Sequence, residues 1–173
     1  SNRTAGFNSI NMVTLTAPTM MICIFLMWIG ASPASTGGGI KTTTFAIATL
    51  NIIALAKGKT RTEIYRREVS DNSLRRAFAI IALSLLVNGI AIFLLMITEK
   101  DKDLLSLAFE TFSAYSTVGL SLNLTPVLSP AGKIIIIFVM FIGRVSMLSL
   151  LIAITKREKY FNYRYPKEEI MMN

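Results

Sequence analysis

Three long apolar segments limit what this chain can fold into. Residues 77–98 form a run of 22 uncharged, mostly apolar positions. An α-helix of that length crosses about 30 Å of hydrocarbon. Residues 12–31 and 134–155 have similar length and character, and Arg144 is the one charge within them. One small soluble core cannot enclose three helices that are apolar on every side. The sequence therefore predicts an all-α integral membrane protein that crosses the membrane more than once.

The basic residues are concentrated between and after these segments. Seven lysines and arginines lie in residues 57–76 and five in residues 156–173. By the positive-inside rule, both stretches are expected to be cytoplasmic. Because they lie between and after membrane-length apolar segments, the net charge of +8 does not indicate a nucleic-acid partner. Membrane lipid is the expected partner of these charges, through anionic headgroups.

The residues that most enzymes and metal centres need are scarce. The chain has no histidine and a single cysteine, Cys23, inside an apolar segment. Zinc sites, Ser-His-Asp catalysis and internal disulfides are therefore excluded from this sequence. We expect a protein that is not an enzyme and that has no cofactor in this chain.

The first apolar segment belongs to a longer uncharged stretch that has to be broken. Residues 4–40 carry no charge, and a straight helix of that length would run about 55 Å. Residues 30–39 combine Pro33 with three consecutive glycines, which disfavour a helix. Helix is expected to resume near Thr42 and to end near Ala56. This break is either a functional loop or a passive kink.

Two short motifs repeat each other. Residues 3–9 and 116–122 each contain Thr-x-Gly before an apolar segment, with a proline 12 or 11 residues after the glycine and a second glycine 24 residues after it. Glycine-bearing irregular backbone at membrane depth is typical of pores lined by carbonyl oxygens. The second copy follows a short apolar stretch, residues 104–115, which Asp103 can cap and which is too short to cross a membrane. We predict a re-entrant pore helix here. The alternative is an amphipathic helix on the outer surface, and Glu110 needs a polar partner in either case.

These motifs, together with Ala31–Thr44 and Gly143-Arg144-Val145, resemble the Trk/Ktr/HKT superfamily of potassium transporters, in particular its TrkH/KtrB-like membrane subunits. The resemblance implies helix–pore loop–helix repeats around one pore, with this chain a C-terminal fragment that holds the last part of repeat 3 and all of repeat 4. Residues 1–56 would carry the repeat 3 filter and a broken transmembrane helix, 57–76 a cytoplasmic linker, 77–155 repeat 4, and 156–173 a cytoplasmic tail. The implied function is potassium uptake. The alternative is a broken-helix secondary carrier of another family.

The resemblance also implies the site residues. The carbonyl filter for K⁺ would involve Thr4, Ala5, Gly6, Phe7, Ser116, Thr117, Val118, Gly119 and Leu120. A gate below it would involve Ser35, Thr36, Gly37, Gly38, Gly39, Lys41 and Arg144. Arg144 is central in the third segment, where an arginine is costly unless it faces a cavity or a partner. We expect it to face the pore within reach of residues 35–39.

Partners and location follow from the same resemblance. Such membrane subunits form homodimers in the inner membrane of prokaryotic cells. They sit on a cytoplasmic ring of nucleotide-binding regulatory subunits.

Overall fold

The computed structural model describes residues 15–33, 35, 37–58, 63–64 and 67–145, and this part of the chain is almost entirely helical. Its elements are α1 (Ala17–Trp28), α2 (Thr42–Ala56), β1 (Glu63–Ile64), β2 (Arg67–Glu68), α3 (Asp71–Thr98), α4 (Leu104–Tyr115), the 3₁₀ turn η2 (Thr125–Val127) and α5 (Pro130–Val145). The two strands form a minimal antiparallel pair in which Glu63 lies opposite Glu68. The predicted helical fold is confirmed at this level.

The longest element is α3, which spans 28 residues, or about 42 Å. Its N-cap is Ser70, whose hydroxyl accepts a hydrogen bond from the Ser73 backbone N–H at 3.4 Å. Within the described ranges, α3 is the one helix that is long and apolar enough to cross a membrane. Helices α1 and α2 are apolar but shorter.

Two prolines determine where α1 and α5 begin. Pro18 lies in the first turn of α1 and Pro130 is the first residue of α5, positions where a missing backbone N–H costs nothing. The expected segment 12–31 is therefore helical only from Ala17 to Trp28 among its described residues, a correction to its predicted extent. In the segment 134–155, α5 begins earlier than predicted and continues to Val145, beyond which residues lie outside the described part.

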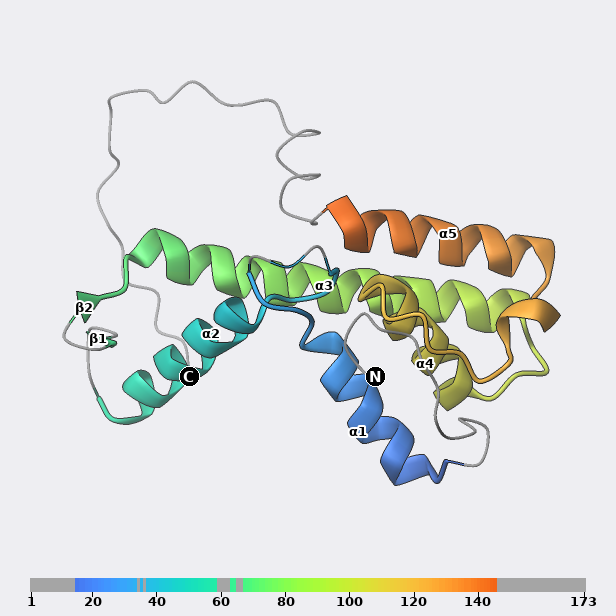
Figure 1. Ribbon diagram of the computed structural model, residues 1–173, viewed down its shortest axis with the longest axis horizontal. Helices are drawn as coiled ribbons and strands as arrows, with labels where there is room; N and C mark the ends of the chain where they lie inside the picture. The colour runs from blue at the N-terminus through green and yellow to red at the C-terminus, as the bar shows by residue number, and fades with distance from the viewer. Residues whose placement is uncertain (1–14, 34, 36, 59–62, 65–66, 146–173) are drawn as a thin grey trace, which may run out of the picture.

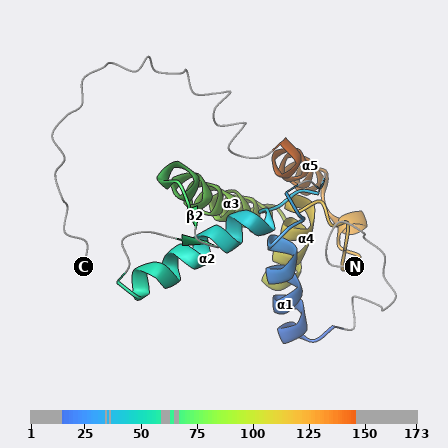
Figure 2. The same cartoon turned by 60° about the vertical axis from the view of Figure 1, so that its left-hand side comes forward.

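A non-helical segment separates α1 from α2. Its described residues, 29–33, 35 and 37–41, are not helical, and α2 runs from Thr42 to Ala56. The two sides of this loop are joined at its neck, where the Gly30 N–H donates to the Ile40 carbonyl at 2.8 Å and the Ile40 N–H to the Trp28 carbonyl at 3.3 Å. Helices α1 and α2 leave the loop in different directions (Figure 2). The chain therefore makes a closed loop here rather than a bend in one helix.

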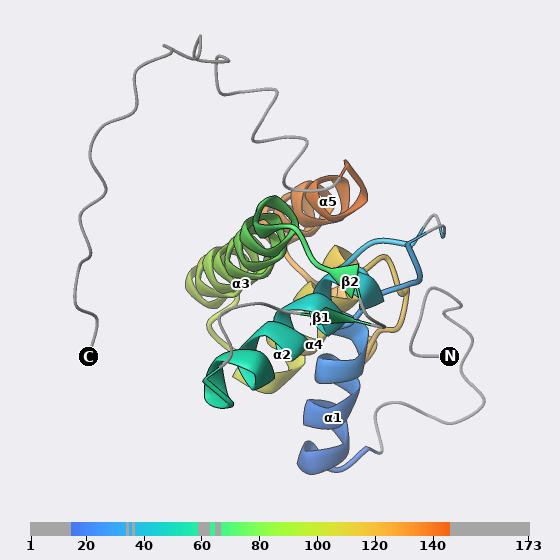
Figure 3. The same ribbon diagram turned by 90° about the vertical axis from the view of Figure 1, so that its left-hand side faces the viewer.

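Helix α4 lies inside the helical assembly, in contact with α1, α3 and α5 (Figures 1 and 3). One apolar cluster joins α3, α4 and α5 around Leu95, Leu107 and Val139. A second joins α1 to α4 and the segment after it, around Met27, Phe109 and Leu120. Within the described residues, α4 is therefore an interior helix of the assembly. By contrast, α3 and α5 expose large apolar side chains such as Phe93 and Phe138, each 63% accessible.

Candidate functional site

The segment that follows α4 has an unusual backbone. Thr117 has a φ of 54° and Gly119 a φ of 84°, whereas Val118 between them is not in the positive region. Left-handed residues at alternate positions rotate the peptide planes between them, so that neighbouring carbonyls are free to point to the same side. Gly119 adopts this geometry without steric cost. For Thr117 it is a strained conformation that the surrounding contacts have to maintain.

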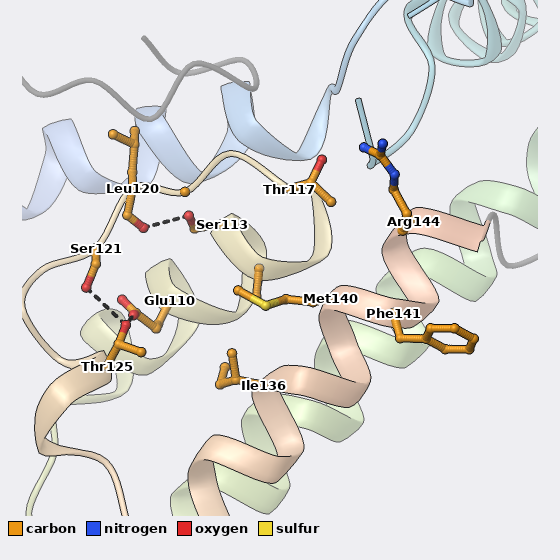
Figure 4. A pocket seen from close by; sticks show the side chains of 12 residues that line it. Glu110, Ser113, Thr117, Leu120, Ser121, Thr125, Ile136, Met140, Phe141 and Arg144 are labelled. Atoms are coloured by element: carbon orange, nitrogen blue, oxygen red, sulfur yellow. Dashed lines mark hydrogen bonds between the residues drawn. The ribbon is translucent and has the colours of Figure 1, made fainter. Parts of the chain in front are cut away.

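Helix α4 provides those contacts. The Thr117 N–H donates to the Ala114 carbonyl at 3.1 Å and the Val118 N–H to the Ser113 carbonyl at 3.0 Å. The Ser113 hydroxyl donates to the Leu120 carbonyl at 2.6 Å (Figure 4). The side chains of Val118 and Leu120 are buried. The segment is therefore held at both ends by the helix that precedes it, and the Leu120 carbonyl already accepts one hydrogen bond.

The glycine-rich loop packs directly on this segment. The Gly38 N–H donates to the Thr117 hydroxyl at 2.8 Å. A Cβ added to Gly38 would lie 2.9 Å from both the Thr117 methyl carbon and the Tyr115 carbonyl oxygen. Gly39 has a φ of 76°, and its Cβ would lie 2.9 Å from the Ser116 hydroxyl. The glycines thus allow two backbone segments, almost 80 residues apart in the sequence, to touch.

Lys41 holds the loop in its observed shape. Its ammonium group donates to the Ser35 carbonyl at 2.9 Å and to the Gly37 carbonyl at 2.7 Å. Both bonds are charge-assisted and close the loop from within. The sequence places Lys41 among the gate residues without indicating this contact.

Arg144 lies where the loop, the segment after α4 and α5 meet. It is in the last described turn of α5 and its side chain is exposed. Together with residues 37–39 and Ser35 it lines a cavity of about 310 Å³. It also lines a larger cavity of about 520 Å³ with Thr117 and Gly119. The neighbouring Gly143 brings α5 against α4, since a Cβ there would lie 1.9 Å from the Tyr115 carbonyl oxygen.

Glu110 has the polar partner that the sequence requires. Its side chain is buried, and one carboxylate oxygen accepts a hydrogen bond from the Thr125 hydroxyl (Figure 4). Ser113, Ser121 and Thr125 line the same large cavity, and sequence reasoning did not single them out. The one available signal was the presence of several hydroxyl residues on both sides of the Thr-x-Gly motif.

The remaining predicted site residues lie outside the described part of the chain. They are Thr4, Ala5, Gly6 and Phe7 of the first Thr-x-Gly copy, and Thr36 of the glycine-rich loop.

Comparisons with known proteins agree on one family. A family model described as TrkH, a cation transport protein, matches residues 1–163. The chain is 44% identical over 168 residues to the Ktr system potassium uptake protein B of Bacillus subtilis. This match covers 97% of this chain and 37% of that protein. It is 40% identical over 177 residues to the potassium/sodium uptake protein NtpJ of Enterococcus hirae, covering 98% of this chain and 39% of that protein.

A solved structure shares the fold. The potassium transporter TrkH from Vibrio parahaemolyticus superposes with a TM-score of 0.70 at 21% identity, over 90% of this chain and 35% of that one. The chain thus spans less than two fifths of the length of these relatives.

Proposed function

Because the chain belongs to the TrkH family of cation transport proteins, we propose that it forms part of a pore through which potassium ions enter the cell. Curated relatives carry names of potassium uptake proteins, and none of those reported above is an enzyme. The observation that carries the proposal is the backbone of residues 117–119, with positive φ at Thr117 and Gly119, at the end of a buried short helix. This alternation supports a carbonyl filter, because it lets neighbouring carbonyls point to the same side.

Selection would take place at this segment. Inward-facing carbonyls replace the water shell of a monovalent cation. The C-terminus of α4 is at Tyr115, directly before the segment. It adds a partial negative charge that favours cations over anions. We assign Ser116–Leu120 to one quarter of the filter, and Thr4, Ala5, Gly6 and Phe7 to another.

Gating would take place at the glycine-rich loop. The glycine-rich loop lies between α1 and α2 and contacts the proposed filter segment through Gly38, whose N–H donates to the Thr117 hydroxyl. A loop of this kind obstructs the pathway where it lies, and glycines let it move at small conformational cost. A passive kink does not need the Lys41 bonds or the contact with Thr117. Arg144, which lines both cavities, would place a positive charge beside the ion path.

The wider arrangement follows from the family. We propose that residues 1–56 carry the third filter copy and the broken helix, that 77–155 form the fourth repeat, and that residues 57–76 and 156–173 face the cytoplasm. The complete protein would be a homodimer in the inner membrane, on a ring of nucleotide-binding subunits. A broken-helix carrier of another family is not favoured, since the family match extends over residues 1–163.

The test is a change of ion preference in the full-length protein. Gly119→Ser places a side chain at a φ of 84° and should disturb carbonyl orientation. Uptake in a strain that lacks other K⁺ uptake systems should then show at least several-fold weaker discrimination of K⁺ against Na⁺. The matched control is Gly89→Ser, because a Cβ at Gly89 meets nothing within 4 Å. Unchanged ion preference in the Gly119 variant, at normal expression, contradicts the filter assignment.

A further inference from the structure

One carboxylate ties the C-terminal end of α3 to the start of α5. Glu99 follows α3 directly and is 9% accessible. Its Oε1 accepts the Ser129 backbone N–H at 2.8 Å, and the Ser129 hydroxyl accepts the Gly132 N–H at 3.1 Å. The two helix ends lie side by side (Figure 1). A side chain from one helix end therefore satisfies a backbone donor at the beginning of another helix, where a negative charge is favourable.

Gly132 leaves room for this carboxylate. It is buried in the first turns of α5, and a Cβ at this position would lie 2.8 Å from Oε1 of Glu99. The end of a glutamate side chain moves more easily than backbone does. A methyl group at Gly132 would therefore push the carboxylate away from Ser129 while α5 itself stays helical.

The surroundings of Glu99 favour its charged form. Hydrogen bonding from Ser129, by its hydroxyl and its backbone, lowers the pKa of the Glu99 carboxyl and outweighs the opposite effect of burial. Lys102, in the loop after α3, and Lys133, on α5, lower this pKa further. The ionised carboxylate therefore contributes fully above its ordinary pKa of about 4.3, and the contribution is lost as pH falls through the lower folded-state value.

Helix α5 connects this contact to the proposed filter. Gly143 lies 11 positions after Gly132 on the same helix, or about 16 Å away. It packs on the Tyr115 carbonyl, directly before the proposed filter segment. Between them, Met140 lines the cavity of about 520 Å³ that also reaches Gly119. A tilt of α5 at its first turn would therefore change the spacing at the filter segment.

We propose that Glu99 is a positioning residue for ion transport: its carboxylate anchors the first turn of α5 at the end of α3 and so sets how closely α5 lies against the proposed filter segment. The inference rests on the proposed pore. Protonation of the carboxylate weakens the anchor, and the affinity for the transported ion falls with it. By the predicted orientation, Glu99 lies at the outer side, where it responds to external pH.

The test is ⁸⁶Rb⁺ uptake by the full-length protein in proteoliposomes, with KM and maximal rate measured between about pH 6 and pH 3.5. The wild-type KM should rise several-fold as pH falls, with a smaller change in maximal rate. Glu99→Gln keeps the length of the side chain and an acceptor for Ser129 but has no charge. Its KM should stay near the wild-type value at low pH and should not vary with pH. Glu99→Ala removes the acceptor as well and should have a higher KM at every pH.

Two further variants separate the anchor from a general effect of charge. Asp101→Asn neutralises an exposed carboxylate in the same loop and should keep the wild-type KM and its pH dependence. Gly132→Ala displaces the Glu99 carboxylate and should raise KM in the wild-type background. In a Glu99→Ala background it should raise KM no further, because the carboxylate that it displaces is gone.

The pattern of KM decides the proposal. A pH-dependent KM in the wild type and Asp101→Asn that is absent in Glu99→Gln supports it. A wild-type KM with unchanged pH dependence in the Glu99 variants overturns it. A loss confined to maximal rate or to the midpoint of thermal unfolding also overturns it, since a structural role alone produces that result. If Glu99→Ala does not fold, Glu99→Gln and Gly132→Ala decide by the same criteria. Failure of the pore proposal would appear instead as unchanged ion preference of Gly119→Ser.

Discussion

At the scale of single residues, glycines, which have no side chain, determine how closely the helices around the site approach each other. Gly143 lets α5 approach so closely that an added Cβ would lie 1.9 Å from the Tyr115 carbonyl oxygen. Backbone atoms cannot yield as the end of a flexible side chain does. The position of α5 against α4, and with it the position of Arg144, depends on this contact.

Gly143→Ala should therefore destabilise the full-length protein. Overpacking of this kind costs about 1–3 kcal/mol, which should appear as a lower midpoint of thermal unfolding in detergent. Gly89→Ala is the control, because the position lies on α3 with open space around it and alanine favours helix by about 1 kcal/mol. Equal midpoints for the two variants would show that α5 can shift without cost.

Arg144→Ala should increase cation flux. Two unit charges about 8 Å apart interact at about 2 kcal/mol at an effective dielectric near 20. Removing the charge should lower the barrier and raise flux in proteoliposomes up to about tenfold, whereas Arg144→Lys should retain much of the barrier. Wild-type flux in Arg144→Ala would remove this residue from the gating mechanism.

At the scale of elements, the loop between α1 and α2 is the part whose shape matters most. It is closed at the neck by the bonds of Gly30 and Ile40, held inside by Lys41, and joined to the proposed filter segment by Gly38. Trp28, at the end of α1, also donates its indole N–H to the Ser84 hydroxyl of α3 at 3.1 Å. The fixed ends and the glycine-rich middle suit a segment that moves locally while the helices remain in place.

Lys41→Met should weaken the closed loop and increase flux while the ion ranking stays the same. Methionine keeps most of the apolar stem, although it is one atom shorter, and has no group that can donate the two hydrogen bonds. The bonds are partly exposed, so an effect of about 1 kcal/mol, or about fivefold in flux, is expected. Lys57→Met is the control, since Lys57 is exposed at the end of α2. If flux falls although the protein inserts normally, the passive-kink interpretation is preferred.

The elements were easier to predict from the sequence than the contacts between them. The resumption of helix at Thr42 and the extent of α4 follow from local rules of capping and breaking. The start of α1 at Ala17 was missed. The apolar character of residues 12–31 gave no sign of it, and the preference of Pro18 for the first turn of a helix was not used. The contact of Gly38 with Thr117 and the cavity at Glu110 bring together residues far apart in the chain, and the Lys41 bonds depend on the shape of an irregular loop. The periodicity of the sequence indicates none of them.

At the scale of the whole molecule, the charge pattern predicts an orientation. Gly58 lies just after α2, in the basic stretch of residues 57–76, and Lys100 lies just after the C-terminal end of α3. In a full-length protein in intact cells, a membrane-impermeant maleimide should label Lys100→Cys from outside. It should label Gly58→Cys only after permeabilisation, with native Cys23 replaced by serine in both. Labelling of both or of neither before permeabilisation would contradict the orientation.

The central claim is that a cation is held by the backbone of residues 116–120. The most direct measurement is anomalous diffraction from crystals of the full-length protein grown with Rb⁺ or Tl⁺. We expect an anomalous peak within coordination distance of the carbonyl oxygens around Gly119, and its loss in crystals of Gly119→Ser. A well-ordered filter segment with no peak, or a peak that persists unchanged in the variant, would contradict the claim.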